Sequence, residues 1–184
     1  MKSESVALLV IDMQQGMSGS AIGERNNPTA ESNIETLVAA WRKSGLPIVH
    51  VRHISRTPGS PFWPGQPGVE FQPEFSPLDD EHVVEKNVPD AFVHTGLEQW
   101  LHVLDIRKVV IVGVSTSNSI EASARTASCL GFRVFVVEDG TFTFAKMDYF
   151  GTWRSASEVH AMSLANLDGE YASILSTAQA LCLL

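Results

Sequence analysis

Two uninterrupted apolar runs, at residues 6–11 and 108–114, restrict the folds that this chain can adopt. The first reads VALLVI and the second KVVIVGV, without alternation between apolar and polar positions. A strand with one face in water alternates, whereas a strand covered on both faces by helices reads as a continuous apolar run. The two runs therefore predict central strands of a parallel sheet that is buried between helical layers.

Weaker strand patterns alternate with helical patterns along the rest of the chain. Parallel neighbours need a crossover, which is usually a right-handed connection through a helix. We therefore expect an α/β fold with three layers, α/β/α, around a Rossmann-like open parallel sheet of about six strands. Because 184 residues fit one core, a single domain over residues 1–184 is expected. The further strands are predicted at residues 48–52, 82–86, 133–138 and 171–175, and the helices at residues 29–43, 95–104, after Gly113, at 155–166 and around 178–181.

Two local details follow from the residues of these elements. Asp139-Gly140 is typical of a turn and is expected to close the strand at 133–138. In the helix at 155–166, we expect Val159, Met162 and Leu164 to be largely buried.

Residues 55–80 form a long connection that is rich in Pro and Gly and carries Phe62, Trp63, Phe71 and Phe75. Connections of this length are uncommon in compact domains unless they have a function. The aromatic side chains favour a segment that folds over another part of the protein. The alternative is a surface loop with scattered aromatic residues.

Charge and cysteine content limit the partners and the compartment. The net charge is −8, and the sequence contains no run of Lys or Arg residues. Nucleic acids and anionic membranes require a basic face, so we expect neither as a partner. The first residues lack the apolar region of a secretion signal, which favours a cytoplasmic protein. In that setting we expect Cys129 and Cys182 to be small buried residues without a disulfide.

Three polar residues follow predicted strands or begin a helix at the same edge of the sheet. Asp12 ends the first strand, Lys86 ends the third, and Ser119 opens the helix after the fourth. Each alone is ordinary, as a turn residue, a solvated strand end or a first-turn serine. Together they describe a base, a cation and a nucleophile beside the N–H groups of a helix N-terminus. An Asp-Lys pair suits a thiol, with its pKa near 8.5, better than a hydroxyl.

These residues stand in motifs that resemble the isochorismatase-like hydrolases, and within them the cysteine amidohydrolase branch. That family has an aspartate in a D-x-Q turn, a lysine after strand three and a cysteine in a G-V-x-T-x-x-C-V turn. This sequence has Asp12-Met-Gln14, Lys86 in EKNVPDAF, and GVSTSNSI at residues 113–120. The similarity continues to Thr126-Ala127 and to residues 136–139, and covers nearly the whole chain in order.

One position departs from this pattern, because Ser119 stands where the family has its nucleophilic cysteine. The serine is explained by a deliberate Cys-to-Ser substitution that stops turnover, by a natural active serine, or by a natural inactive one. We favour the first of these three explanations.

The resemblance implies further features of the site. A cis peptide between Val114 and Ser115 would direct the backbone N–H groups of Ser115 and Ser119 to one oxyanion. By analogy with family positions, the pocket wall is expected to contain Gln14, Met17, Trp63 and Phe92. Relatives are commonly dimers or tetramers, so a homo-oligomer is expected, and no cofactor is implied.

A metal site is not expected. Nicotinamidases of this family bind a metal through an Asp-x-His pair near strand two. The corresponding stretch here, His50-Val-Arg52-His53, has no aspartate. We assign no catalytic role to the remaining histidines, which include His53 and His160.

The function implied is hydrolysis of a C–N bond in a small amide, ureide or carbamoyl compound. Asp12, Lys86 and the side chain at position 119 would form the catalytic triad. Two alternatives remain: an isochorismatase-type vinyl ether hydrolase that uses Asp12 as an acid, and a small-molecule binding protein of the same fold without catalysis.

Overall fold

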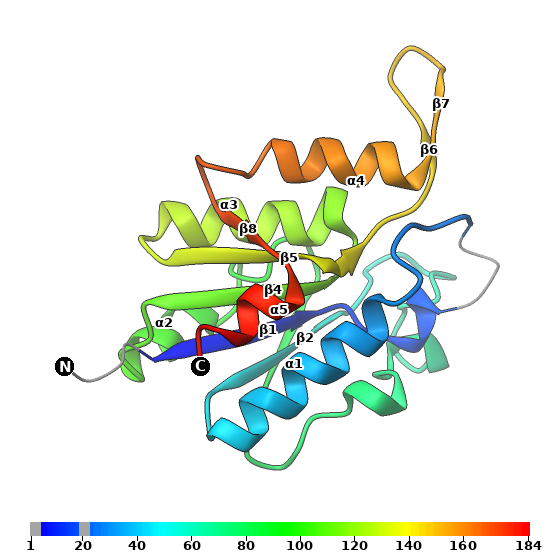
Figure 1. The fold of residues 1–184 in the computed structure, drawn as a ribbon. Helices are drawn as coiled ribbons and strands as arrows, with labels where there is room; N and C mark the ends of the chain where they lie inside the picture. The colour runs from blue at the N-terminus through cyan, green and yellow to red at the C-terminus, as the bar shows by residue number, and fades with distance from the viewer. Residues whose placement is uncertain (1–4, 19–22) are drawn as a thin grey trace.

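A computed structural model describes residues 5–18 and 23–184 and has the predicted α/β architecture (Figure 1). A six-stranded parallel sheet has the order β3-β2-β1-β4-β5-β8. Its strands are β1 (Val6–Ile11), β2 (Ile48–His53), β3 (His82–Lys86), β4 (Lys108–Val114), β5 (Arg133–Phe142) and β8 (Ser173–Leu175). The helices are α1 (Ala30–Ser44), α2 (Leu97–Val103), α3 (Glu121–Cys129), α4 (Ala156–Ala165) and α5 (Thr177–Leu181), with short turns η1 (Gln15–Met17), η3 (Pro67–Val69), η4 (Pro73–Phe75) and η5 (Thr116–Ile120).

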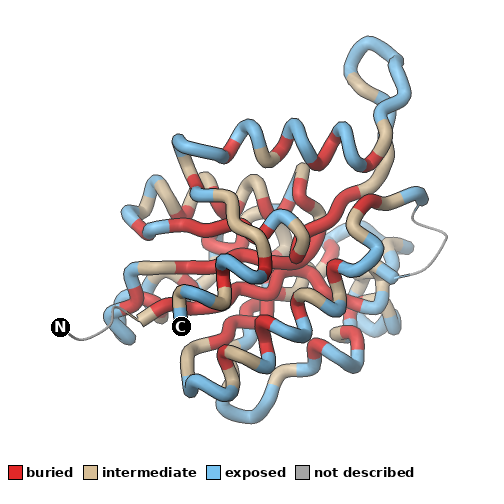
Figure 2. Tube along the Cα trace, in the orientation of Figure 1, coloured by how far each residue is buried: buried red, intermediate tan, exposed pale blue. Residues whose placement is uncertain are grey.

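The two apolar runs form the centre of the sheet, as predicted. β1 lies between β2 and β4, and every residue of β1 is buried. Alternate residues of β1 contribute to two separate cores: Leu9 packs in the core covered by α2 and α3, and Leu8 packs in the core covered by α1. Figure 2 shows this buried interior between helices whose outer faces are exposed. A continuous apolar run is therefore required here, because both faces of the strand are covered.

Helix α1 is fixed to the sheet by an apolar stripe and by one indole. Ile34, Leu37 and Trp41 are fully buried. The Nε1–H of Trp41 donates a hydrogen bond of 3.1 Å to the carbonyl of Val6, which satisfies the polar atom of an otherwise apolar ring. The helix ends at Gly45, whose φ of 63° is a left-handed conformation that glycine adopts without cost.

The prediction that Asp139-Gly140 ends the fifth strand is wrong, because β5 continues to Phe142. The pairing of β4 with β5 changes register between Ile111 and Gly113, so the strand passes through an irregularity and resumes. Asn27 donates hydrogen bonds of 2.7 Å to the carbonyls of Glu138 and Thr141. These side-chain donors satisfy backbone groups that the irregularity leaves outside the ladder.

Two predictions of burial are also wrong. Cys129 ends α3 and Cys182 follows α5, and both are exposed, because each lies where a helix ends at the surface. Met162 on α4 is 64% exposed.

A short antiparallel hairpin, β6 (Lys146–Met147) with β7 (Trp153–Arg154), precedes α4. It was not predicted, since two residues per strand leave no periodic pattern.

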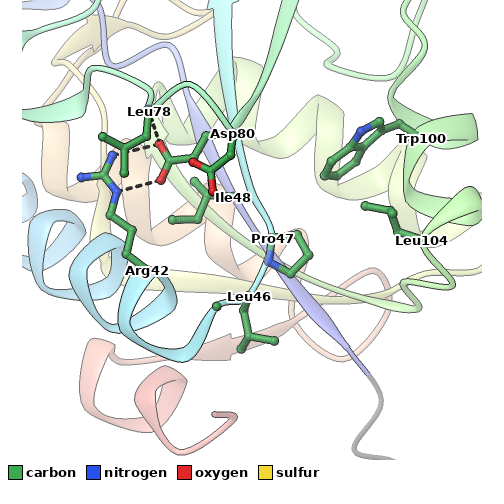
Figure 3. A pocket seen from close by; sticks show the side chains of 10 residues that line it. Arg42, Leu46, Pro47, Ile48, Leu78, Asp80, Trp100 and Leu104 are labelled. Carbon is green, nitrogen blue, oxygen red and sulfur yellow. Dashed lines mark hydrogen bonds and ion pairs between the residues drawn. The ribbon is translucent and has the colours of Figure 1, made fainter.

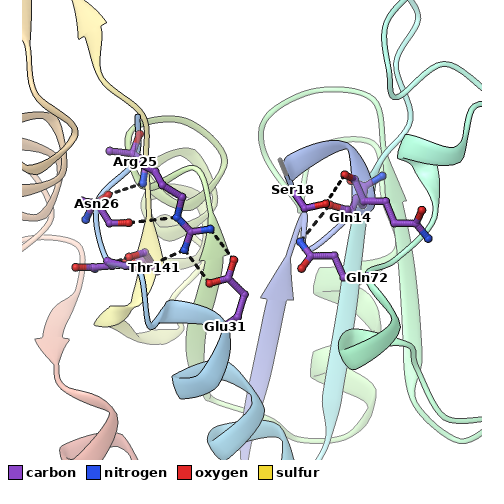
Figure 4. Close-up of polar contacts among 10 residues, drawn as sticks. Gln14, Ser18, Arg25, Asn26, Glu31, Gln72 and Thr141 are labelled. Carbon is purple, nitrogen blue, oxygen red and sulfur yellow. Dashed lines mark hydrogen bonds and ion pairs between the residues drawn. The ribbon is translucent and has the colours of Figure 1, made fainter. Parts of the chain in front are cut away.

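The long connection after β2 covers the turn that follows β1. Gln72 and Gln15 donate backbone hydrogen bonds across the two segments, to Met13 and Glu70, of 3.0 and 2.8 Å. The Gln72 side chain also approaches Gln14, as Figure 4 shows. Phe75 enters the core beneath α1. The prediction that this segment folds over another part of the protein therefore agrees with the structure, and the part it covers is the turn after Asp12.

No helix among residues 5–18 and 23–184 is long and apolar enough to cross a membrane.

The carboxylate of Glu81, directly before β3, joins three segments. Glu81 accepts hydrogen bonds from Arg42 (2.7 and 2.9 Å), from the backbone N–H of Leu78 (2.8 Å) and contacts His50 Nε2 (2.8 Å). The group borders a cavity of about 290 Å³ near the start of β2 (Figure 3). Burial of Glu81 opposes its ionisation, but the bonds from Arg42 and Leu78 outweigh burial and lower its pKa to about 2.

We predict that Glu81→Gln reduces the free energy of unfolding at pH 7 by about 1.5–3 kcal/mol, because it removes hydrogen bonds to a charged group. A carboxylate whose folded pKa is lowered stabilises the protein above its ordinary pKa of 4.5, and this stabilisation is lost as the pH falls toward about 2. The difference between wild type and variant should therefore shrink on acidification. Urea unfolding at several pH values measures it; a difference that is constant between pH 7 and pH 3 would contradict the assignment.

Candidate active site

Three residues from separate strand ends meet at the carboxyl edge of the sheet. Asp12 follows β1, Lys86 is the last residue of β3, and Ser119 lies in η5, between β4 and α3. Asp12 has a φ of 55°, a left-handed conformation that aspartate tolerates better than most residues. β2 separates β3 from β1, so the long stem of Lys86 is needed to bring its ammonium to Asp12.

The three side chains form a closed triangle of hydrogen bonds. Ser119 Oγ donates to Asp12 Oδ2 over 2.7 Å, and Lys86 Nζ donates to the same oxygen over 2.7 Å. Lys86 Nζ also donates to Ser119 Oγ over 3.2 Å. Asp12, Lys86 and Ser119 are only 1%, 2% and 5% exposed. The structure thus brings together the three residues that the sequence suggested as base, cation and nucleophile.

The electrostatics of Asp12 are dominated by burial. Removal of the carboxyl from water raises its pKa, and the charge and hydrogen bond of Lys86 oppose the rise without cancelling it. Oδ2 receives both hydrogen bonds, whereas Oδ1 is buried and has no partner among the described residues. One carboxylate oxygen therefore orients the side chain at 119, and the other accepts no hydrogen bond from the described residues.

The turn that carries Ser119 is held by side chains other than Ser119. The Val114–Ser115 peptide is cis, as the resemblance implied. Thr116 Oγ1 lies 2.9 Å from His160 Nδ1 on α4. Thr143 Oγ1 lies 2.8 Å from Ser115 Oγ and 3.0 Å from Ser117 Oγ. The hydroxyls of this stretch therefore anchor η5 to α4 and to the end of β5.

Two residues predicted for the pocket wall make contacts that the sequence does not indicate. Gln14 is fully buried; its amide donates to the carbonyls of His53 and Val69 and accepts from the backbone N–H of His53. It joins the turn after Asp12 to the segment that covers it. Phe92 packs its ring against Phe132, 5.9 Å away, in the core beneath α2 and α3.

The position of Phe92 has a simple cause. After Lys86 the chain runs along α3, where Ala91 N–H donates to Ser123 Oγ over 2.9 Å and Asp90 accepts from Thr126. These contacts place residues 90 and 91 beside α3. Met17 and Trp63, the other two predicted wall residues, are half-buried in the turn after β1 and in the covering segment.

Sequence reasoning missed His53, which lies beside the charged pair. His53 pairs in register with Lys86 at the ends of β2 and β3. Burial and then the charge of Lys86 lower the pKa of His53, so its ring is neutral at pH 7. Its ring packs edge-on to Phe62 of the covering segment, at 6.0 Å. The signal available in the sequence was its place at the end of a strand between those that carry Asp12 and Lys86.

No three His, Cys, Asp or Glu side chains within residues 5–18 and 23–184 are grouped as metal ligands.

The fold and site define a small α/β protein of hydrolase type, with a buried carboxylate, ammonium and hydroxyl at the strand ends. The family description "Isochorismatase domain" matches residues 6–179, and the chain belongs to the isochorismatase family.

Relatives of known name and structure support this assignment over nearly the full length. The isochorismatase family protein YrdC of Bacillus subtilis is 35% identical and aligns with 96% of this chain and 94% of its own. Nicotinamidase 3 of Arabidopsis thaliana is 30% identical, with 90% of this chain and 81% of the relative aligned. A crystal structure of an isochorismatase family protein from Chromobacterium violaceum has a TM-score of 0.95 and 49% identity, and covers 100% of this chain and 95% of its own.

We predict that Lys86→Met lowers the free energy of unfolding by about 3–5 kcal/mol, because it leaves the carboxylate of Asp12 buried without its partner. The double variant Asp12→Asn with Lys86→Met has no charge at either position and should recover part of this loss. Urea unfolding of wild type, both single variants and the double variant gives the coupling energy. Additive losses would show that the two side chains are not coupled.

Proposed function

We propose that the protein is an amidohydrolase that cleaves a C–N bond in a small amide, ureide or carbamoyl compound. One observation carries the proposal: a single buried oxygen of Asp12 accepts hydrogen bonds from both Ser119 and Lys86. This arrangement supplies a base next to a nucleophile and a cation that keeps the base ionised. The relation to a protein named nicotinamidase supports the choice of a C–N bond.

In the proposed reaction the side chain at position 119 attacks the carbonyl carbon of the substrate. Asp12 accepts the proton of the nucleophile and returns it to the leaving amine or ammonia, and water then hydrolyses the acyl-enzyme. The N–H groups of Ser115 and Ser119 stabilise the oxyanion. Lys86 compensates the negative charge. The residues proposed for the substrate-binding wall are Gln14, Met17, Trp63 and Phe92. No cofactor or metal is needed for these steps.

Serine at position 119 limits this chemistry. A hydroxyl gives up its proton far less readily than a thiol, and serine nucleophiles normally act with a more basic histidine. We propose that Ser119 replaces the cysteine of active relatives and suppresses turnover while the binding site is retained. The hydrogen bonds of Ser119 to Asp12 and Lys86 support retention of the site's shape.

We also propose that the protein acts in the cytoplasm as a homo-oligomer, a dimer or tetramer, on a small-molecule substrate. The net charge of −8 supports the absence of nucleic-acid and anionic-membrane partners.

We predict that Ser119→Cys raises the rate of ammonia or amine release from at least one compound in a panel of amides, ureides and carbamoyl compounds by at least 100-fold, about 2.7 kcal/mol of barrier. Ammonia detection and mass spectrometry of the acyl-enzyme measure the effect. The matched control is Ser119→Cys with Asp12→Asn, which keeps the thiol and removes the base.

Three outcomes are distinguishable in this experiment. Activity that depends on both the introduced thiol and Asp12 supports the amidohydrolase. Cleavage of a vinyl ether by the unmodified chain, dependent on Asp12 alone, would favour an isochorismatase-type reaction. Ligand binding without turnover by any variant would indicate a binding protein.

The pH dependence of the Ser119→Cys variant follows from Asp12. The base must be ionised, so kcat/KM should fall as the pH decreases through the pKa of Asp12, which burial raises above the ordinary 3.8. Adding Lys86→Met should move this acidic limb to still higher pH, because the ammonium favours the carboxylate. Rates with the best amide of the panel test this; a limb that does not move would contradict the role of Lys86.

A further inference from the structure

We propose that the hairpin before α4 is a dimerisation arm that packs into a groove on a second copy of this chain. We call residues 145–154 the arm. The proposal assigns a surface to the homo-oligomer proposed above, and it does not depend on the catalytic reaction.

The arm exposes large apolar side chains. Tyr149, Phe150 and Trp153 are 96%, 89% and 62% exposed, and Met147 is 61% exposed. In Figure 1 the arm projects beyond the sheet and the end of α4, and Figure 2 shows its exposure. Aromatic residues of this kind are enriched at protein interfaces and at their energetic centres.

The arm is nevertheless a defined structure. Asp148 Oδ1 accepts from the backbone N–H groups of Phe150 (3.0 Å) and Thr152 (2.9 Å), and Asp148 Oδ2 accepts from Arg154 Nε (2.9 Å). The backbone N–H of Asp148 donates to the carbonyl of Thr152 over 2.8 Å. These bonds order the backbone that carries the aromatic residues, which is the preorganisation expected of a binding element.

A groove of about 710 Å³ lies beside the arm, between η5, α4 and the arm itself. Its apolar surface includes Met162, which is 64% exposed on α4. Acidic and basic side chains lie along its borders, so the groove has no strong charge of one sign. Its lining residues are Ser117, Glu121, Lys146, Asp148, Arg154, Glu158, Val159, Ala161, Met162, Ser163, Ala165 and Asn166.

The second copy is the occupant that these features favour. The arm and the groove are adjacent, because Lys146, Asp148 and Arg154 belong to both. A two-fold axis beside them places each arm in the groove of the other copy, which is the self-complementary contact of a symmetric dimer. The mixed charges of the groove match a copy of the same surface, whereas a polyanion would require a basic groove.

The apolar area of the arm is also large enough to contribute most of a dimer interface. Aromatic side chains bury about 150–250 Å² each, so the three rings of the arm offer about 500 Å². A monomer seldom exposes an apolar patch larger than about 300–600 Å² without a use for it. The groove adds further area toward the roughly 800 Å² per partner of a standard interface. Since Ser117 lines the groove, the arm of the partner would border the turn that carries Ser119.

Sedimentation velocity of the full chain and of single-surface variants tests the proposal. We expect the unmodified chain to sediment as a dimer or as a multiple of dimers. The arm variant Phe150→Ser with Trp153→Ser and the groove variant Met162→Glu should each dissociate. Val103→Ser is the control, because Val103 is 76% exposed on α2 and lies outside both surfaces. Circular dichroism verifies that each variant is folded.

Mixing the arm variant with the groove variant gives a result that nonspecific association would not reproduce. A heterodimer of the arm variant and the groove variant has one intact contact, whereas either variant alone has none. The mixture should therefore associate more tightly than either component. A monomeric unmodified chain, an arm variant that stays oligomeric, or a mixture no tighter than its components would each overturn the proposal.

Discussion

The buried contact between Asp12 and Lys86 is the interaction on which the site depends. Two charges at 1% and 2% exposure are tolerated only when each compensates the other. Their 2.7 Å contact ties the end of β1 to the end of β3 across β2. Because β2 lies between β1 and β3, a residue on β3 needs a long side chain, such as that of Lys86, to place a cation beside Asp12.

The covering segment packs against the turn that follows Asp12. Both the nitrogen and the oxygen of the Gln14 side-chain amide form hydrogen bonds, which join the turn after Asp12 to β2 and to the covering segment. Gly16 lies so close to Phe62 that an added Cβ would come within 2.6 Å of the ring. Both contacts keep the segment against the turn. Asp12 and Lys86 are themselves buried, and charges removed from water interact more strongly.

The sequence predicted the parts of the fold that depend on periodicity. β1, β3 and β4 have the predicted bounds, and β1 and β4 end where an apolar run is followed by a polar residue, Asp12 or Ser115. Asp12, Lys86 and Ser119 could be grouped because the carboxyl ends of parallel strands share an edge. The irregularity in β5 was missed because it involves hydrogen bonds from Asn27, which is distant in the sequence. The arm was missed because strands of two residues leave no periodic pattern.

The same limit applies to the side chains around the site. Residue type and position place Gln14 and Phe92 near the site, but the direction of each side chain decides which groups it contacts. Gln14 is directed to backbone groups, and Phe92 follows a path along α3 that sequence spacing does not reveal. Nothing in the sequence context of His160 points to Thr116, 44 residues away, so its anchoring contact could not be predicted.

The geometry of the turn around position 119 is largely independent of the side chain at that position. Thr116 is held by His160, and Ser115 and Ser117 are held by Thr143. The backbone N–H of Ile120 donates to the carbonyl of Ser115 over 3.2 Å. Because none of these bonds uses the Ser119 side chain, exchange of oxygen for sulfur changes the acidity of the side chain at 119 more than its position. In the proposed reaction, reactivity and architecture are therefore separable: the surrounding elements position residue 119, and its own oxygen or sulfur atom determines how readily it would act as a nucleophile.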